Sequence, residues 1–244
     1  MRSYKRLTTP TRGEDAHEFY GLAGLEKTGL RFAKRSISVA CVDPLTERQL
    51  DLLGRSAALD PPVRILGGYA EDALLAGTLT RPHVDVDWIF PRSEYDLRLA
   101  QARELGFDEF DVRGESAAGR PFYLHARNGD LELEVGVVDD DEAALWLTVG
   151  RLGFDIGGEP ASAGYRIELP HDTFEHPAAA IDGVTVWPAS PLALYQLRVG
   201  IAQKGSFGEL GEKQLQAMRA LKARFFPELS DEDLIPRIEP LTQR

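Results

Sequence analysis

The run Leu66-Gly67-Gly68-Tyr69-Ala70-Glu71-Asp72, followed from Arg81 by Arg-Pro-His-Val-Asp-Val-Asp-Trp-Ile-Phe, decides the fold of this chain. The glycine pair leaves an apolar strand and opens a helix, where backbone N–H groups can approach phosphate oxygens at the positive helix end. In the next strand, Asp85 and Asp87 are two residues apart and therefore share a face. Two neighbouring carboxylates repel each other unless a cation lies between them. Since Mg²⁺ takes one or two carboxylates plus substrate phosphates, the two segments predict phosphoryl or nucleotidyl transfer.

The order and spacing of these residues resemble the signature of the DNA-polymerase-β-type nucleotidyltransferases. The matching positions are Gly67-Gly68-Tyr69-Ala70-x-Asp72 and Arg81-x-His83-x-Asp85-x-Asp87. Within that superfamily they are most similar to the aminoglycoside 2″-adenylyltransferases and lincosamide nucleotidyltransferases. The similarity is close over residues 63–110 and weaker as far as residue 200. It specifies the superfamily but leaves the substrate open.

The resemblance implies a third catalytic carboxylate on a strand beside the two aspartates. Residues 130–135 read Asp-Leu-Glu-Leu-Glu-Val, so acids alternate with apolar residues. We expect Glu132 to complete the metal site with Asp85 and Asp87, with Glu134 as the close alternative. Relatives often carry aspartate at this point, so the register stays open. The same alternation is also typical of any half-exposed strand.

The residues expected to contact the nucleotide are Gly67, Gly68, Tyr69, Arg81 and His83. The two glycines would seat the β- and γ-phosphates, and Arg81 would stabilise charge on a leaving pyrophosphate. Arg81 could equally form a surface salt bridge. His83 either touches a phosphate, orients an aspartate or has a purely structural role. Tyr69 either packs against the nucleotide or holds the helix in place.

The composition fits a globular protein of one large or two small domains. The 244 residues are 43% hydrophobic and 27% charged, and 39 acids against 28 lysines and arginines give a formal net charge of −11. That charge argues against a general nucleic-acid binder, which would show a basic face. An acidic surface attracts cationic ligands such as aminoglycosides, although it also serves solubility alone. The single cysteine, Cys41, excludes an intramolecular disulfide.

No apolar run approaches the ~18 residues of a membrane span, and the N-terminus has no apolar leader segment. These features predict a cytoplasmic protein with no membrane partner.

The hydrophobic pattern predicts an α+β fold with a nucleotidyltransferase-like mixed sheet flanked by helices and a C-terminal helical segment. Strands are expected at 37–42, 63–66, 83–90, 107–112, 121–126, 131–138, 152–156, 165–169 and 184–187. Helices are expected at 46–53, 69–77, 93–105, 191–199 and 213–221, with a possible further helix at 230–238. Ser93 is the expected N-cap of the third helix, and Gly106 its stop signal. The acidic run 139–142 is interpreted as a solvated turn.

Three regions are expected along the chain. Residues 1–45 form a locally basic N-terminal extension, 46–188 the nucleotidyltransferase catalytic core, and 189–244 the C-terminal helical segment.

Together, these features predict a metal-dependent transfer of a nucleoside monophosphate from a nucleoside triphosphate, preferably ATP, to a hydroxyl group. Asp85 and Asp87 would hold Mg²⁺ or Mn²⁺, and the carboxylate of Glu132 would take the acceptor's proton. The acceptor would be a small hydroxylated molecule, such as an aminoglycoside-like antibiotic, and a nucleic-acid partner is not expected. Three alternatives stay open: a toxin-like enzyme that modifies RNA or protein through the basic N-terminal segment, a non-catalytic nucleotide-binding relative, and a metal-dependent phosphohydrolase. The last also uses paired acids but normally adds a His-Asp constellation, which the sequence does not display.

Overall fold

In the computed structural model, the residues whose structure is described are 43–115, 119–141, 144–149, 164–204 and 211–241. The strands expected at 37–42 and 152–156 lie outside these ranges, as does nearly all of the expected N-terminal extension.

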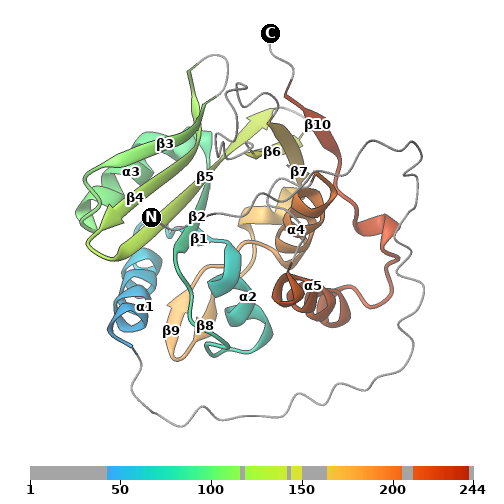
Figure 1. Ribbon diagram of the computed structural model, residues 1–244, viewed down its shortest axis with the longest axis horizontal. Coiled ribbons are helices and arrows are strands. Elements are labelled where there is room, and N and C mark those ends of the chain that lie inside the picture. Colours follow the sequence, from blue (N-terminus) through green and yellow to red (C-terminus); the bar gives the residue numbers. More distant parts are fainter. Residues whose placement is uncertain (1–42, 116–118, 142–143, 150–163, 205–210, 242–244) are drawn as a thin grey trace, which may run out of the picture. The chain divides into compact units, whose positions relative to one another are not determined.

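An eight-stranded mixed sheet runs through the described part of the chain (Figure 1). Its order is β1-β2-β5-β6-β7-β10, and the β3–β4 hairpin joins it by pairing with β5. The strands are β1 (Arg64–Ile65), β2 (Val86–Pro91), β3 (Phe110–Glu115), β4 (Pro121–Asn128), β5 (Leu131–Asp141), β6 (Ala144–Val149), β7 (Tyr165–Leu169) and β10 (Ile238–Pro240). The short strands β8 (Ala179–Ile181) and β9 (Val184–Val186) form a second sheet. Pairing is parallel between β2 and β5 and antiparallel between the other named strands.

Five α-helices accompany the sheet in the described residues. They are α1 (Pro44–Ala57), α2 (Gly67–Leu75), α3 (Tyr95–Glu104), α4 (Pro191–Lys204) and α5 (Glu212–Phe225). The side chain of Asp43 caps α1 by accepting from the backbone N–H groups of Leu45 and Thr46, and Pro44 fits the first helical position. The helix α2 begins at Gly67, whose φ of 65° is readily available only to glycine.

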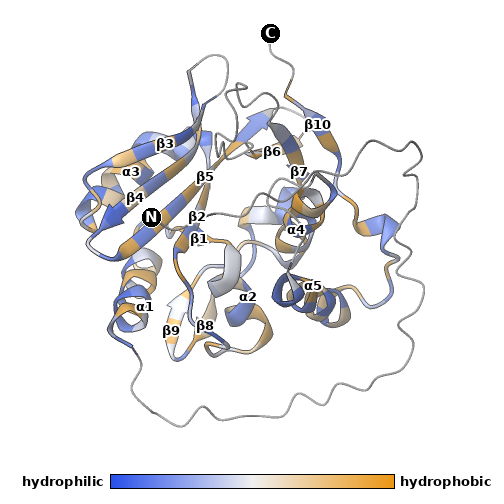
Figure 2. Cartoon of the chain, in the orientation of Figure 1, coloured by the Kyte–Doolittle hydropathy of each residue, from blue (hydrophilic) through white to orange (hydrophobic). Residues whose placement is uncertain are grey.

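The sheet has one apolar face and one face that carries the acids. Val86 and Trp88 of β2 and Leu133 and Val135 of β5 are buried on the first face. Their neighbours Asp87 and Glu134 point to the opposite face because strand side chains alternate. Figure 2 shows this alternation of hydrophobic and hydrophilic residues along β3, β4 and β5.

The helix α4 packs against the acid-bearing face. A Cβ atom on Gly200 of α4 would lie 2.9 Å from Cγ1 of Ile167 on β7, so the helix and the sheet are in close contact there. Ile167 is the register partner of Leu147 on β6, and Leu147 is the register partner of Val138 on β5. Val138 is four residues after Glu134, so these side chains lie on the same face of the sheet. The cleft described below lies between α4 and this face.

The α+β class and the mixed sheet expected from the sequence are confirmed. Three local expectations are wrong. The 3₁₀ turn Arg92–Glu94 precedes α3, so Ser93 is not its N-cap, and Glu94 takes that position without a side-chain hydrogen bond. The expected turn at 139–142 is in part strand, because β5 continues through Asp141 and pairs with β6, a strand that the pattern analysis missed.

The third difference lies near the C-terminus. In place of a helix at 230–238 the chain forms the 3₁₀ turn Glu232–Leu234 and the strand β10, which pairs with β7. Ile235 precedes Pro236 and is extended, because a following proline disfavours helical backbone. The C-terminal residues therefore return to the sheet. None of the helices in the described ranges is both long and apolar enough to cross a membrane.

Candidate active site

Three carboxylates converge on the acid-bearing face. Asp87 lies in β2, Asp85 directly precedes that strand, and Glu134 is the register partner of Asp87 in the parallel strand β5. One carboxylate oxygen from each residue lies within 4.8 Å of the others. Oxygen ligands at this spacing suit a hard divalent cation.

Glu132, the residue expected as third ligand, is not in this cluster. Its carboxylate lies 2.9 Å from Nη2 of Arg127 and 3.5 Å from Nε2 of His125. Glu132 and Glu134 share a face of β5, so alternation alone could not separate them. The register does, because it sets Glu134 opposite Asp87. Of the two glutamates considered from the sequence, the geometry of the described residues favours Glu134 as the third ligand.

The three acids of the cluster have raised pKa values. Burial, with the nearby carboxylates of Asp85 and Glu134, raises the pKa of Asp87 to about 8. Burial is also the main cause that raises the pKa of Asp85 and of Glu134. A hydrogen bond from the Tyr123 hydroxyl opposes the rise at Glu134. Three acids placed in this way need protons or a cation to share the site.

The Gly67–Gly68 turn lies directly against the cluster. A Cβ atom on Gly67 would overlap the carboxylate of Asp87, and one on Gly68 would overlap the ring of His83 and come within 2.8 Å of Nη2 of Arg81. Both positions therefore need glycine. The N-cap residue Leu66 makes no side-chain capping hydrogen bond, and Leu66, Gly67 and Gly68 line the cleft, so no capping side chain competes there for the first N–H groups of α2.

A buried hydrogen-bond network fixes the loop that leads into β2. The Asp72 carboxylate accepts from the backbone N–H and the hydroxyl of Thr80, at 3.0 and 2.5 Å, and lies 2.9 Å from Nε2 of His83. Asp72 and His83 are both buried. These contacts of Asp72 connect α2 with the loop that leads into β2.

Tyr69 belongs to the same network. Its hydroxyl donates to Oε1 of Gln49 at 2.7 Å, and Nε2 of Gln49 donates to the backbone oxygens of His83 and Val84. Tyr69 is only 1% exposed and does not line the cleft, so it supports the loop rather than a nucleotide. Of the two roles considered for Tyr69, the structure supports the one in which it holds the helix in place.

A cleft of about 400 Å³ contains the cluster. Gly67, Gly68 and Arg81 line one part of it, and residues of β6 and α4 line another. Arg81 forms no ion pair with the residues that the structure describes, so its guanidinium is available to an anion. Arg198 of α4, which the sequence analysis did not single out, also lines the cleft and pairs with Glu71 at 2.9 Å.

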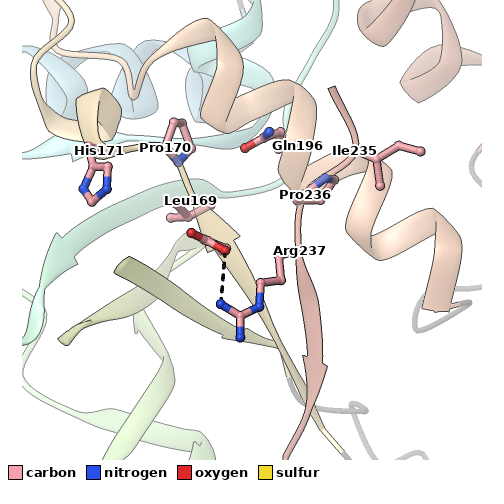
Figure 3. Close-up of a pocket in the computed structure, with 8 residues that line it drawn as sticks. Leu169, Pro170, His171, Gln196, Ile235, Pro236 and Arg237 are labelled. Carbon is pink, nitrogen blue, oxygen red and sulfur yellow. Dashed lines mark ion pairs between the residues drawn. The ribbon is translucent and has the colours of Figure 1, made fainter. Parts of the chain in front are cut away.

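A second hollow, of about 250 Å³, lies between β7, α4 and the C-terminal residues. Figure 3 shows its lining residues, with Arg237 reaching toward the carboxylate of Glu168 at 4.0 Å. None of the residues expected at the active site lines it. The carboxylate cleft is therefore the candidate active site.

The mixed sheet, with a helix-opening glycine turn beside two aspartates and a third acid, has the arrangement expected of a nucleotidyltransferase-type fold. Comparison of structures agrees: the chain is similar to the solution structure of the antibiotic-resistance factor ANT(2″)-Ia, with a TM-score of 0.50 and 22% identity over 75% of this chain and 86% of that one. It is also similar to the crystal structure of ANT(2″)-Ia in complex with adenylyl-2″-tobramycin, with a TM-score of 0.51 and 22% identity over 78% and 92% of the two chains. No protein-family model matches the chain, and no curated protein matches its sequence. These likenesses establish the fold.

Proposed function

We propose that this protein is a metal-dependent nucleotidyltransferase that moves a nucleoside monophosphate from a nucleoside triphosphate, preferably ATP, to a hydroxyl group of a small molecule in the cytoplasm. The observation that carries the proposal is the convergence of Asp85, Asp87 and Glu134 beside the Gly67–Gly68 turn. The adenylylated tobramycin bound to ANT(2″)-Ia supports adenylyl transfer to an antibiotic-like acceptor as the reaction class.

The three carboxylates fit Mg²⁺ or Mn²⁺. The cluster consists of oxygen donors, and the raised pKa of Asp87 shows that its negative charge lacks sufficient compensation in the protein alone. Asp85, Asp87 and Glu134 would therefore hold the ion. When bound, it would neutralise charge on the triphosphate during in-line displacement at the α-phosphorus.

The glycine turn and Arg81 would bind the triphosphate. Gly67 and Gly68 present backbone at the positive end of α2, where β- and γ-phosphate oxygens can come close. The guanidinium of Arg81, next to Gly68, would stabilise the charge on the departing pyrophosphate. The contacts of Asp72 with Thr80 and His83 would keep this loop in position.

Glu134 would accept the proton of the acceptor hydroxyl. The acceptor oxygen then forms a bond to the α-phosphorus, and the bond from that phosphorus to the bridging oxygen breaks. The electron pair leaves with pyrophosphate. The hydrogen bond from Tyr123 to Glu134 would set the orientation of the carboxylate for this step.

The test is to incubate the full chain with each nucleoside triphosphate, Mg²⁺ and a panel of antibiotics, metabolites and transfer RNA. Pyrophosphate release and an acceptor mass shift are measured, with Asp85→Asn as the inactive control. We expect release from one preferred nucleotide, with a small molecule labelled. Release no greater than that of the control would refute the enzyme assignment, and nucleotide binding without turnover would identify a non-catalytic relative. Labelled transfer RNA would replace the small-molecule acceptor by RNA.

A further inference from the structure

The cleft continues past the three carboxylates along the sheet. Its floor there is Gly136, two residues after Glu134 on the same face of β5. A Cβ atom on Gly136 would lie only 3.1 Å from Cδ1 of Leu147, so even a methyl group would crowd this part of the cleft. The absence of a side chain at Gly136 lets Leu147 of β6 lie close to β5 beside Glu134.

The walls of this part are mostly apolar, with Thr148 of β6 and Gln214 of α5 among the other residues that line the cleft. On α4, Leu194, Leu197 and Ile201 line the cleft at a spacing that puts them on one side of the helix. On β6, Leu147 and Val149 share the face that looks toward them. Of these residues, Leu197, Ile201 and Val149 keep part of their surface exposed, so a ligand can contact them.

Apart from Arg81 in the phosphate-binding part, the arginines and acids of the described lining already have partners or form the carboxylate cluster. The carboxylate of Glu71 lies 2.9 Å from Nε of Arg198, and Nε of Arg113 donates to Asp111 at 2.5 Å. The three remaining carboxylates of the described lining form the candidate metal site. None of these acids is left to pair with an ammonium group on a ligand.

The apolar walls share the cleft with Glu134, on the side of the carboxylates away from the glycine turn. Across the sheet, the turn that follows β1 comes first, then Asp87 on β2, then Glu134 on β5, whose register partner on the far side is His125 of β4. Leu147 of β6 lies further along β5, opposite Val138, and lines the same cleft. In an in-line displacement the attacking and leaving oxygens lie on opposite sides of the phosphorus. If pyrophosphate leaves toward Gly67–Gly68, the acceptor approaches from the Glu134 side of the carboxylates, through the part of the cleft that Leu147 and Val149 also line.

We propose that the acceptor is a hydroxylated small molecule with an apolar face rather than a polycation, and that Leu197 is a specificity-determining residue in contact with that face. This inference rests on the proposed nucleotidyl transfer for the role of the ligand. The apolar face packs against α4 and β6, and a hydroxyl group on the opposite side reaches Glu134.

The test measures acceptor binding by calorimetry. The full chain is loaded with Mg²⁺ and an ATP analogue whose α–β bridge is a methylene group, so that no turnover occurs. The probes are hexyl β-D-glucoside and methyl β-D-glucoside, which offer the same hydroxyl groups, and tobramycin, a polyamine. We expect the hexyl glycoside to bind about tenfold more tightly than the methyl one, since each buried CH₂ group adds to affinity. Tobramycin should bind more weakly than the hexyl glycoside.

Two matched variants separate the possible sites. Leu197→Asn should remove the advantage of the hexyl over the methyl glycoside while leaving affinity for the ATP analogue unchanged. Leu97→Asn, at an exposed position on α3, should leave both affinities unchanged. Equal binding of the two glycosides, or tighter binding of tobramycin, overturns the inference. A loss of analogue binding in Leu197→Asn would show that the walls hold the nucleoside base and would also overturn it.

The glycosides are also measured without the analogue. If the analogue does not bind at all, the proposed nucleotidyl transfer fails. A hexyl preference that depends on Leu197 would then still show an apolar ligand site, so failure of the reaction and failure of the acceptor class remain distinguishable.

Discussion

Asp87 and Glu134 are register partners on the parallel strands β2 and β5, and their carboxylates share one cluster with Asp85. Glu132 lies on the same face of β5, but its carboxylate contacts Arg127 and His125. We therefore expect Glu134→Gln to lower kcat/KM at least about a hundredfold, since a charge at the reacting centre is lost.

The matched variant Glu132→Gln breaks a partly exposed ion pair and should change kcat/KM by less than about fivefold. Initial rates of pyrophosphate release at saturating Mg²⁺ measure both. If Glu132→Gln lowers kcat/KM more than Glu134→Gln does, Glu132 is the third metal ligand and the assignment of Glu134 is wrong.

Gly67 and Gly119 offer a second matched comparison. Their φ angles are 65° and 67°, but a Cβ atom would overlap the Asp87 carboxylate at Gly67 and meets nothing within 4 Å at Gly119. Alanine at either position should cost about 1–2 kcal/mol of stability through backbone strain. Only Gly67→Ala should also lose activity and weaken Mn²⁺ binding, because it displaces a metal ligand. Thermal unfolding and metal titration check both effects, and equal activity in the two variants would contradict the contact.

The raised pKa of Asp87 makes the metal-free protein sensitive to pH. The carboxyl has a pKa of about 8 in the folded state and near 3.9 when unfolded, so the folded state binds more protons in between. The stability from this group is fully present below pH ~4 and is lost as the pH rises toward 8. Asp87→Asn cannot ionise and escapes this loss.

In EDTA, the Tm of Asp87→Asn should therefore exceed that of the wild type by several degrees at pH 8, and the gap should shrink as the pH falls. Adding Mg²⁺ should stabilise the wild type and not the variant. A Tm difference that increases toward acid pH would contradict a raised pKa of Asp87 in the folded state.

Tyr123 holds the third carboxylate. Its hydroxyl donates to Glu134 and lowers the pKa of that acid against the effect of burial. Tyr123→Phe should raise this pKa further and weaken Mg²⁺ affinity roughly fivefold, about the worth of one hydrogen bond. The defect should diminish at higher pH, where Glu134 ionises. Affinity measured across a pH series checks this, and a deficit independent of pH would indicate a packing effect instead.

The two aspartates and the glycine pair could be found from sequence because their chemistry lies within 21 residues and their spacing is local. The choice between Glu132 and Glu134 could not be made from the sequence, because both side chains lie on the same face of β5. Only the pairing of β5 with β2 shows which of them lies opposite Asp87. Arg198 carried no local signal, because its partner Glu71 is 127 residues away in the chain.

Other elements depended on long-range pairing. The acidic end of β5 is stabilised as a strand by β6, and Asp139 there pairs with Arg92. The overall charge of −11 suggested a cationic acceptor, yet among the described acids that line the cleft Glu71 pairs with Arg198 and the other three form the candidate metal site. Charge summed over a whole chain does not report the composition of one cleft.

The parallel pairing of β2 with β5 has a consequence for how the site comes into existence. The two strands are separated by α3 and the β3–β4 hairpin, so Glu134 reaches Asp87 only after these intervening elements have formed and docked. Closing such a distant contact is slow relative to local structure. Metal affinity should therefore arise late in folding, and a nascent chain released before residue 131 would carry both aspartates and the glycine turn yet remain inert.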